Sequence, residues 1–86
     1  MQDEQTCLRV REYLSRRGIR TRSLSCYEDE GGHIVIELGL FPSLSKNLDK
    51  TELTFDFGEI CDRDFDLPEV SERDDLLVLT FYERPG

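Results

Sequence analysis

The sequence predicts an α+β domain in which one N-terminal helix packs on a mainly antiparallel sheet of four or five strands. Three observations support this class. Apolar residues near the N-terminus recur at helical spacing, several later runs alternate between apolar and polar residues, and glycine or proline separates those runs. The 86 residues are enough for one small domain, so we treat residues 1–86 as a single unit.

The helix is predicted over residues 3–17. Cys7, Val10 and Leu14 recur at positions i, i+3 and i+7, which places them on one face. Gly18 follows directly, and glycine readily adopts the left-handed conformation that ends many helices.

Two strands are predicted next, over residues 19–28 and 33–41. Between them lie Gly31 and Gly32, which can supply the positive φ angles of a hairpin loop. Pro42 ends the second strand because it has no backbone N–H to donate to a sheet.

A third strand is predicted over residues 51–57, where apolar and polar residues alternate most regularly. Leu53, Phe55 and Phe57 would point to one side of the sheet, and Gly58 would end the strand.

A fourth strand is predicted over residues 76–82. It is apolar on both faces, so we expect it to be central or covered on both sides. The intervening residues 59–75 are expected to be partly loop. Within them, residues 61–67 alternate and suit an edge strand, whereas residues 69–75 are predicted to form a solvated loop.

The charge of the chain is concentrated in residues 49–75, which carry eleven acids and three bases. Residues 1–48 and 76–86 are each neutral, so the formal net charge of −8 is local. A concentrated field of one sign is informative about binding partners. The alternative interpretation is a solvated segment that keeps the protein soluble.

We predict that the acidic segment docks on a basic protein partner, a nucleic-acid-binding protein or complex. Carboxylates on alternate residues of a strand repeat every ~6.6 Å, whereas duplex DNA carries one charge per ~1.7 Å of axis. Two rows of carboxylates would therefore imitate nucleic acid better than one. The predicted partner-binding residues are the acids of two such rows with one aromatic residue among them: Glu52, Asp56, Glu59, Asp62, Asp64, Phe65, Asp66 and Glu69.

In charge and size alone, the chain is similar to the small acidic inhibitors that phages direct against host defence, such as anti-CRISPR proteins. It is also similar in these respects to immunity proteins that block nuclease toxins. No sequence motif of either group is present. This likeness favours inhibition or modulation as the effect on the partner.

A second charged segment, residues 9–22, contains six arginines and only Glu12 as an acid. Clustered arginines favour binding to nucleic acid, but the strongly negative acidic segment would repel a polyanion. We therefore expect no direct nucleic-acid binding. The alternative is a binding site made of the arginines on the helix and first strand: Arg9, Arg16, Arg20 and Arg22. The arginines of residues 9–22 could instead pair with the acidic segment. A further alternative is a structural or assembly subunit that forms a homodimer through an uncovered sheet face or edge, for example through a half-polar strand such as residues 19–28.

No metal or cofactor is expected. Asp62, Asp64 and Asp66 resemble the start of a calcium-binding loop, but Leu67 and Arg73 stand where that loop needs glycine and glutamate. The cysteines and the single histidine lack the paired spacing of a zinc site.

The chain is not expected to be an enzyme. His33 is the only histidine, and no spacing selects a cysteine to act with it as a nucleophile. Gly31 and Gly32 are flanked by acids, which would repel a phosphate.

A cytoplasmic location without membrane binding is expected. Residues 1–5 have neither the basic nor the apolar stretch of a secretory signal peptide. The most apolar run, residues 34–41, contains Glu37 and is too short to cross a bilayer. Free thiols are expected at all three cysteines: Cys7, Cys26 and Cys61.

Overall fold

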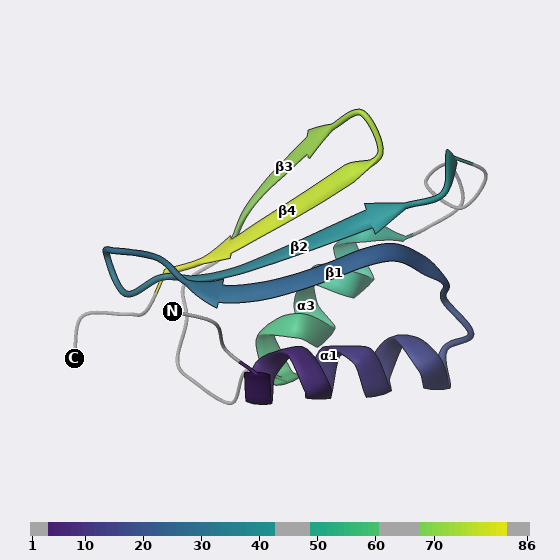
Figure 1. Cartoon of the computed structure of the whole chain (residues 1–86), viewed down its shortest axis with the longest axis horizontal. Helices are drawn as coiled ribbons and strands as arrows, with labels where there is room; N and C mark the ends of the chain where they lie inside the picture. The colour runs from purple at the N-terminus through teal and green to yellow at the C-terminus, as the bar shows by residue number, and fades with distance from the viewer. Residues whose placement is uncertain (1–3, 43–48, 61–67, 83–86) are drawn as a thin grey trace.

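The computed structural model describes residues 4–42, 49–60 and 68–82 (Figure 1). Four strands form one antiparallel sheet in the order β1-β2-β4-β3, and the two helices among the described residues lie on the same side of it (Figure 1). This two-layer arrangement confirms the predicted α+β class. In chain order the elements are α1 (Glu4–Arg16), β1 (Thr21–Glu28), β2 (Ile34–Leu40), α3 (Lys50–Ile60), β3 (Glu69–Arg73) and β4 (Leu76–Phe81).

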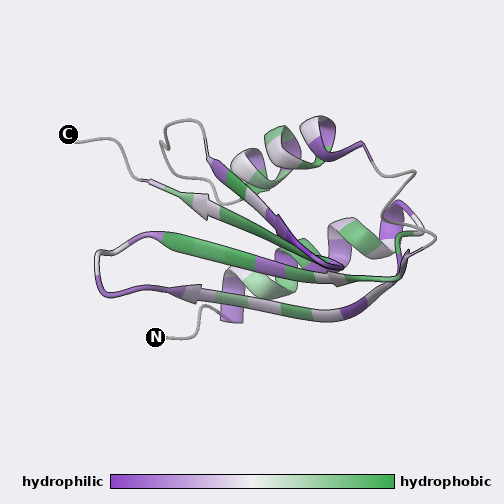
Figure 2. Cartoon of the chain, turned by 90° about the horizontal axis from the view of Figure 1, so that it is seen from above, coloured by the Kyte–Doolittle hydropathy of each residue, from purple (hydrophilic) through white to green (hydrophobic). Residues whose placement is uncertain are grey.

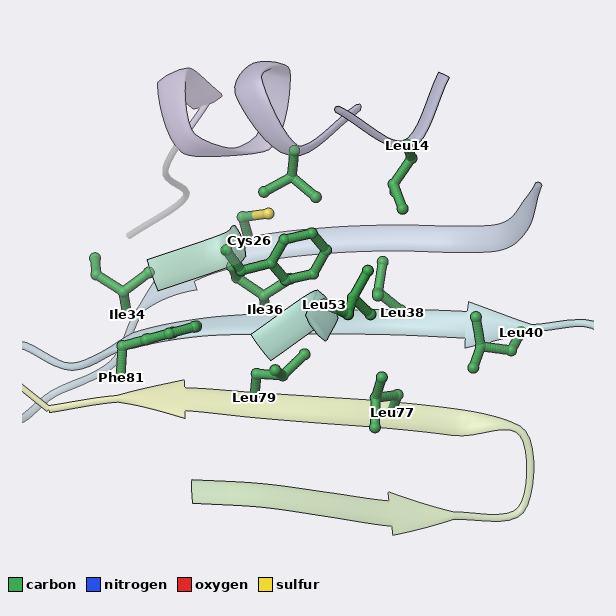
Figure 3. Close-up of a cluster of buried hydrophobic side chains, with 12 residues drawn as sticks. Leu14, Cys26, Ile34, Ile36, Leu38, Leu40, Leu53, Leu77, Leu79 and Phe81 are labelled. Carbon is green, nitrogen blue, oxygen red and sulfur yellow. The ribbon is translucent and has the colours of Figure 1, made fainter. Parts of the chain in front are cut away.

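The core lies between the sheet and the two helices. Alternate residues of β2 and β4 point toward the helices, which is the period of two expected of strands (Figure 3). The buried cluster draws on α1, β1, β2, α3 and β4: Val10, Leu14, Cys26, Ile34, Ile36, Leu38, Leu40, Leu53, Phe57, Leu77, Leu79 and Phe81.

Helix α1 forms as predicted. Val10 and Leu14 are buried on the face toward the sheet, and Cys7 packs partly buried against the same cluster. Gly18 has a φ of +68°, and the backbone N–H of Ile19 donates to the carbonyl of Leu14 at 2.9 Å. The glycine therefore ends the helix in the left-handed conformation that its lack of a side chain permits.

The β1–β2 hairpin also forms as predicted. Its turn is fixed by Asp29, whose Oδ1 accepts the backbone N–H groups of Gly31 and His33, each at 2.9 Å. Gly32 has a φ of +80°, so one of the two glycines is needed for the turn.

The predicted strand at residues 51–57 is wrong, because these residues belong to helix α3. Leu53 and Phe57 are four residues apart and buried, as on one helix face, whereas Phe55 is 63% exposed. Asp49 caps the helix, since its Oδ1 accepts the backbone N–H of Glu52 at 3.1 Å. Two buried residues four positions apart share one face in a strand and also in a helix, so their spacing does not distinguish the two. The cap at Asp49 favours the helix.

The solvated loop predicted for residues 69–75 is also wrong. Strand β3 occupies Glu69–Arg73 and pairs with β4 through a tight turn at Asp74 and Asp75. Asp74 has a φ of +54°, which aspartate tolerates better than most residues. Because β3 is exposed along its whole length, it lacks the apolar pattern that marks a half-buried strand. Strand β4 lies between β2 and β3, which confirms its predicted central position. The edge strand predicted over residues 61–67 lies outside the described residues.

Candidate protein-docking surface

The acidic residues lie on the side of the molecule formed by α3 and β3. Helix α3 lies on the β3 side of the molecule, whereas α1 packs against β1 (Figure 2). Lys50, at the start of α3, pairs with Glu72 of β3 and holds the helix to that edge. We call the exposed part of α3 and β3 on this side the acidic surface.

Glu52 and Asp56 lie on one face of α3, but that face turns toward α1. Arg17 pairs with Glu52, and its guanidinium lies 3.8 Å from Asp56 Oδ2. The hydroxyl of Tyr13 donates to Asp56. Two of the predicted partner-binding acids therefore already have a cation within the chain.

Tyr13 anchors this contact between the helices. Its ring meets that of Phe57 edge-on, with centroids 5.6 Å apart, and the Arg17 guanidinium carbon lies 5.5 Å from its centroid. Burial, and then the hydrogen bond to Asp56, raise the pKa of Tyr13 to about 12. The Tyr13 hydroxyl is thus a hydrogen-bond donor throughout the physiological pH range.

Glu59 and Glu69 are exposed at the two ends of the segment that joins α3 to β3. Glu69 accepts a hydrogen bond from the Tyr82 hydroxyl at 2.6 Å, and this bond, together with burial, raises the pKa of Tyr82. The remaining predicted partner-binding residues lie outside the described part of the chain: Asp62, Asp64, Phe65 and Asp66.

Internal pairing leaves much of the acidic charge unopposed. Of the acids within residues 49–75 that the structure describes, the three with a cationic partner are Glu52, Asp56 and Glu72. Those without an ion pair to another described residue are Asp49, Glu59, Glu69, Asp74 and Asp75. A negative field therefore persists on the α3–β3 side after intramolecular pairing.

The arginines of residues 9–22 lie mostly on the opposite side of the molecule. Arg17 is at the junction of the two helices, Arg16 pairs with Glu12 at 3.7 Å, and Arg9 donates to the carbonyl of Ile60 at 3.2 Å. The arginines that pair with no described carboxylate are Arg11, Arg20 and Arg22. The basic and acidic segments thus meet at one seam, and otherwise face apart.

A polar cluster closes the end of the sheet near the β1–β2 turn. His33 Nδ1 lies 3.0 Å from Asp29 Oδ2, and the His33 ring meets that of Tyr82 edge-on at 4.5 Å. The backbone N–H of His33 is the largest cause that lowers the pKa of Asp29. Because these contacts hold the turn against Tyr82, the residue after β4, they give His33 a structural role.

Within the described ranges, no group of three or more histidine, cysteine, aspartate or glutamate residues is arranged to hold a metal ion. The aspartates at positions 62, 64 and 66 fall outside those ranges. The thiol of Cys26 is buried and that of Cys7 is partly buried, while Cys61 is not described. None of the helices described has the length and apolar character needed to cross a membrane.

Sequence reasoning missed two features of this surface: helix α3 and strand β3. The alternative that arginines of residues 9–22 pair with the acidic segment is realised at Arg17, which contacts Glu52 and Asp56. The signal for α3 was present in Asp49 followed three residues later by Glu52, a pattern of helix N-termini. No local pattern singled out Arg17 among the arginines, because its contact joins residues 35 positions apart in the chain. No protein family model, curated protein or solved structure matches this chain.

Proposed function

We propose that this protein binds a basic partner through the acidic surface and thereby inhibits or modulates that partner, which is a nucleic-acid-binding protein or complex. The observation that carries the proposal is the group of acids on the α3–β3 side that have no cation among the described residues. Lysine and arginine side chains that normally meet phosphates would meet these carboxylates instead.

The internal pairs refine which residues would contact the partner. Reversing the charge of Glu52 or Asp56 would remove its ion pair with Arg17 between the two helices. We therefore assign these two acids primarily a structural role. Glu59 and Glu69 are exposed and flank the segment that carries Asp62 and Asp64. We therefore assign the main binding role to residues 59–69 and a supporting role to the acids of the helix.

Separation of the two charged sides supports the same proposal. At physiological ionic strength the Debye length is about 8 Å, and the principal axes of the molecule extend 40 × 23 × 22 Å. A partner approaching the α3–β3 side would therefore experience little repulsion from the unpaired arginines on the α1–β1 side. Electrostatic steering would speed association and make its rate dependent on salt.

The test compares two charge-reversed variants. Asp62→Lys with Asp64→Lys reverses two charges in the segment between α3 and β3, whereas Glu4→Lys with Glu12→Lys makes the same change in net charge on α1. The partner is captured from lysate of the native host, eluted with a salt gradient and identified. Its association rate with each variant is then measured.

We expect the first variant to lower the association rate by roughly tenfold or more, and the second to change it far less. Both variants should melt at nearly the wild-type temperature. The second should lose slightly more stability, because it places lysines near the N-terminus of α1. Equal binding by the two variants would overturn the proposal. A gel shift of random duplex or single-stranded nucleic acid by the wild-type chain would favour the arginine-based alternative.

A further inference from the structure

Strand β1 forms one edge of the sheet and is longer than the strand at the other edge. It spans eight residues and pairs with β2 alone among the described elements, whereas β3 spans five. Natural edge strands are commonly protected by charged residues, bulges or short length. Strand β3 is short and charged, but the middle of β1, residues 23–27, is uncharged and its only irregularity is the register shift between Thr21 and Ser23.

The two ends of β1 carry opposite charges. Arg20 and Arg22 lie at its beginning, and Glu28 and Glu30 lie at its end and in the following turn. Eight residues of strand extend about 26 Å at roughly 3.3 Å per residue, so the acids cannot neutralise the arginines of the same copy. In an antiparallel pair of identical strands, however, the basic end of each copy meets the acidic end of the other.

A groove beside the basic end supports this arrangement. It has a volume of about 380 Å³ and lies between the end of α1 and the beginning of β1. Leu14, Ile19 and Leu24 line it together with Arg11 and Arg20. Neither arginine forms an ion pair with a described residue. The groove therefore offers an apolar lining and two cations to whatever lies next to the edge.

We propose that a second copy of this chain pairs with β1 across a twofold axis, which extends the sheet to eight antiparallel strands. Position 25 is midway between Arg22 and Glu28, and also between Arg20 and Glu30. A twofold axis near Ser25 thus brings the basic end of each copy beside the acidic end of the other, with Arg20 and Glu30 just outside the paired strands. The acidic end of the second copy lies over the groove, where Arg11 and Arg20 meet its carboxylates. Such isologous contacts are the commonest way in which soluble proteins form dimers.

Disulfide trapping tests the position of the axis. Ser25 is exposed on the sheet face away from the helices, opposite Glu37 of β2. Residues directly opposite each other in antiparallel strands have Cβ atoms about 4.5–5.5 Å apart, close to the range that a disulfide can bridge. Ser25→Cys should cross-link under mild oxidation. The matched control is Ser71→Cys, because Ser71 is an exposed serine on the same face of the opposite edge strand. The wild-type chain controls for its own thiols.

Charge exchange tests the register independently of cross-linking. One variant carries Arg20→Glu with Arg22→Glu, and the other carries Glu28→Arg with Glu30→Arg. Each variant alone would oppose like charges, and we expect its dimer dissociation constant to rise by about tenfold or more. When the two variants are mixed in equal amounts, opposite charges meet again at both ends of the paired strands. They should then form a heterodimer, which sedimentation velocity would detect. Circular dichroism of each variant establishes that it is folded.

A wild-type chain that stays monomeric across the accessible concentration range would overturn the inference. So would a dimer that survives both reversals, or one that cross-links through Ser71→Cys and not through Ser25→Cys. An acidic peptide that binds a monomeric wild-type chain at the groove would assign the edge to a different ligand. The dimer uses the side of the molecule opposite the acidic surface, so these outcomes are independent of the proposed function.

Discussion

The two phenylalanines of α3 provide the sharpest test of the fold beneath the acidic surface. Phe57 is fully buried and packs in the core, whereas Phe55, two residues earlier, is 63% exposed. In a strand, both side chains would point to the same side and contribute similarly. The helix therefore predicts very different costs for the same substitution at the two positions.

Removing the Phe57 ring should cost about 3–5 kcal/mol, which is the usual range for phenylalanine to alanine in a core. The edge-on contact with Tyr13 contributes to this loss, since such pairs add about 0.5–1.5 kcal/mol beyond burial. A stability of about 0.05–0.15 kcal/mol per residue gives a chain of 86 residues roughly 4–13 kcal/mol in total. At the lower end of that range Phe57→Ala would unfold the chain, and Phe57→Leu, expected to cost about 1–2 kcal/mol, provides a folded variant.

Phe55→Ala should change the free energy of unfolding by no more than about 0.5 kcal/mol, as is usual for an exposed site. The assay is urea unfolding followed by circular dichroism, in which the midpoint reports stability and an unchanged slope reports an unchanged unfolding transition. Destabilisation of similar size at positions 55 and 57 would refute the helix and restore the strand. So would tolerance of alanine at Phe57.

Three further predictions concern individual residues. Asp49→Ala should cost about 1 kcal/mol by removing the cap of α3, and Asp49→Asn, which keeps an acceptor oxygen, should cost less in the same urea assay. Gly18→Ala should cost about 1–2 kcal/mol purely through its φ of +68°, because no other atom lies within 4 Å of the added methyl group; thermal unfolding would show this loss, and an unchanged melting temperature would contradict it. The pKa of Tyr13 is raised from 10.0 to about 12, so its contribution to stability should be complete below pH 10 and be lost as the pH rises toward 12. Ultraviolet titration of tyrosinate should show a component near pH 12 that Tyr13→Phe removes.

The sequence predicted the elements correctly where the spacing of apolar residues fits either a helix or a strand, but not both. Cys7, Val10 and Leu14 match only the helical period, and Gly31 with Gly32 marks the turn of the first hairpin. These elements depend on local patterns that neighbouring residues can specify.

The remaining elements depended on contacts that a local pattern does not contain. The spacing of Leu53 and Phe57 fits both periods, and the apolar Phe55 between them made the strand look more regular than the helix. Strand β3 buries none of its residues, so its pairing with β4 and the turn at Asp74 define it instead. Of the candidate site, sequence established which residues are acidic but not which of them already pair within the chain. That division depends on the approach of α1 to α3, which places Arg17 between two carboxylates of α3.

The two proposals have a joint consequence for binding strength. Pairing through β1 places the α3–β3 side of each copy at opposite ends of the extended sheet, because β3 is the far edge from β1. A dimer would therefore present two acidic surfaces pointing apart, and it could engage two sites on an oligomeric or repetitive basic partner. Linked engagement raises the overall affinity by about 10²–10⁴ without any new contact, provided that both sites can be reached at once. Reversing Arg20 and Arg22 would then lower affinity for a multivalent partner while leaving the affinity of a single site intact, whereas reversing Asp62 and Asp64 would weaken both. The ratio of these two effects separates the contribution of the dimer from that of the acidic surface.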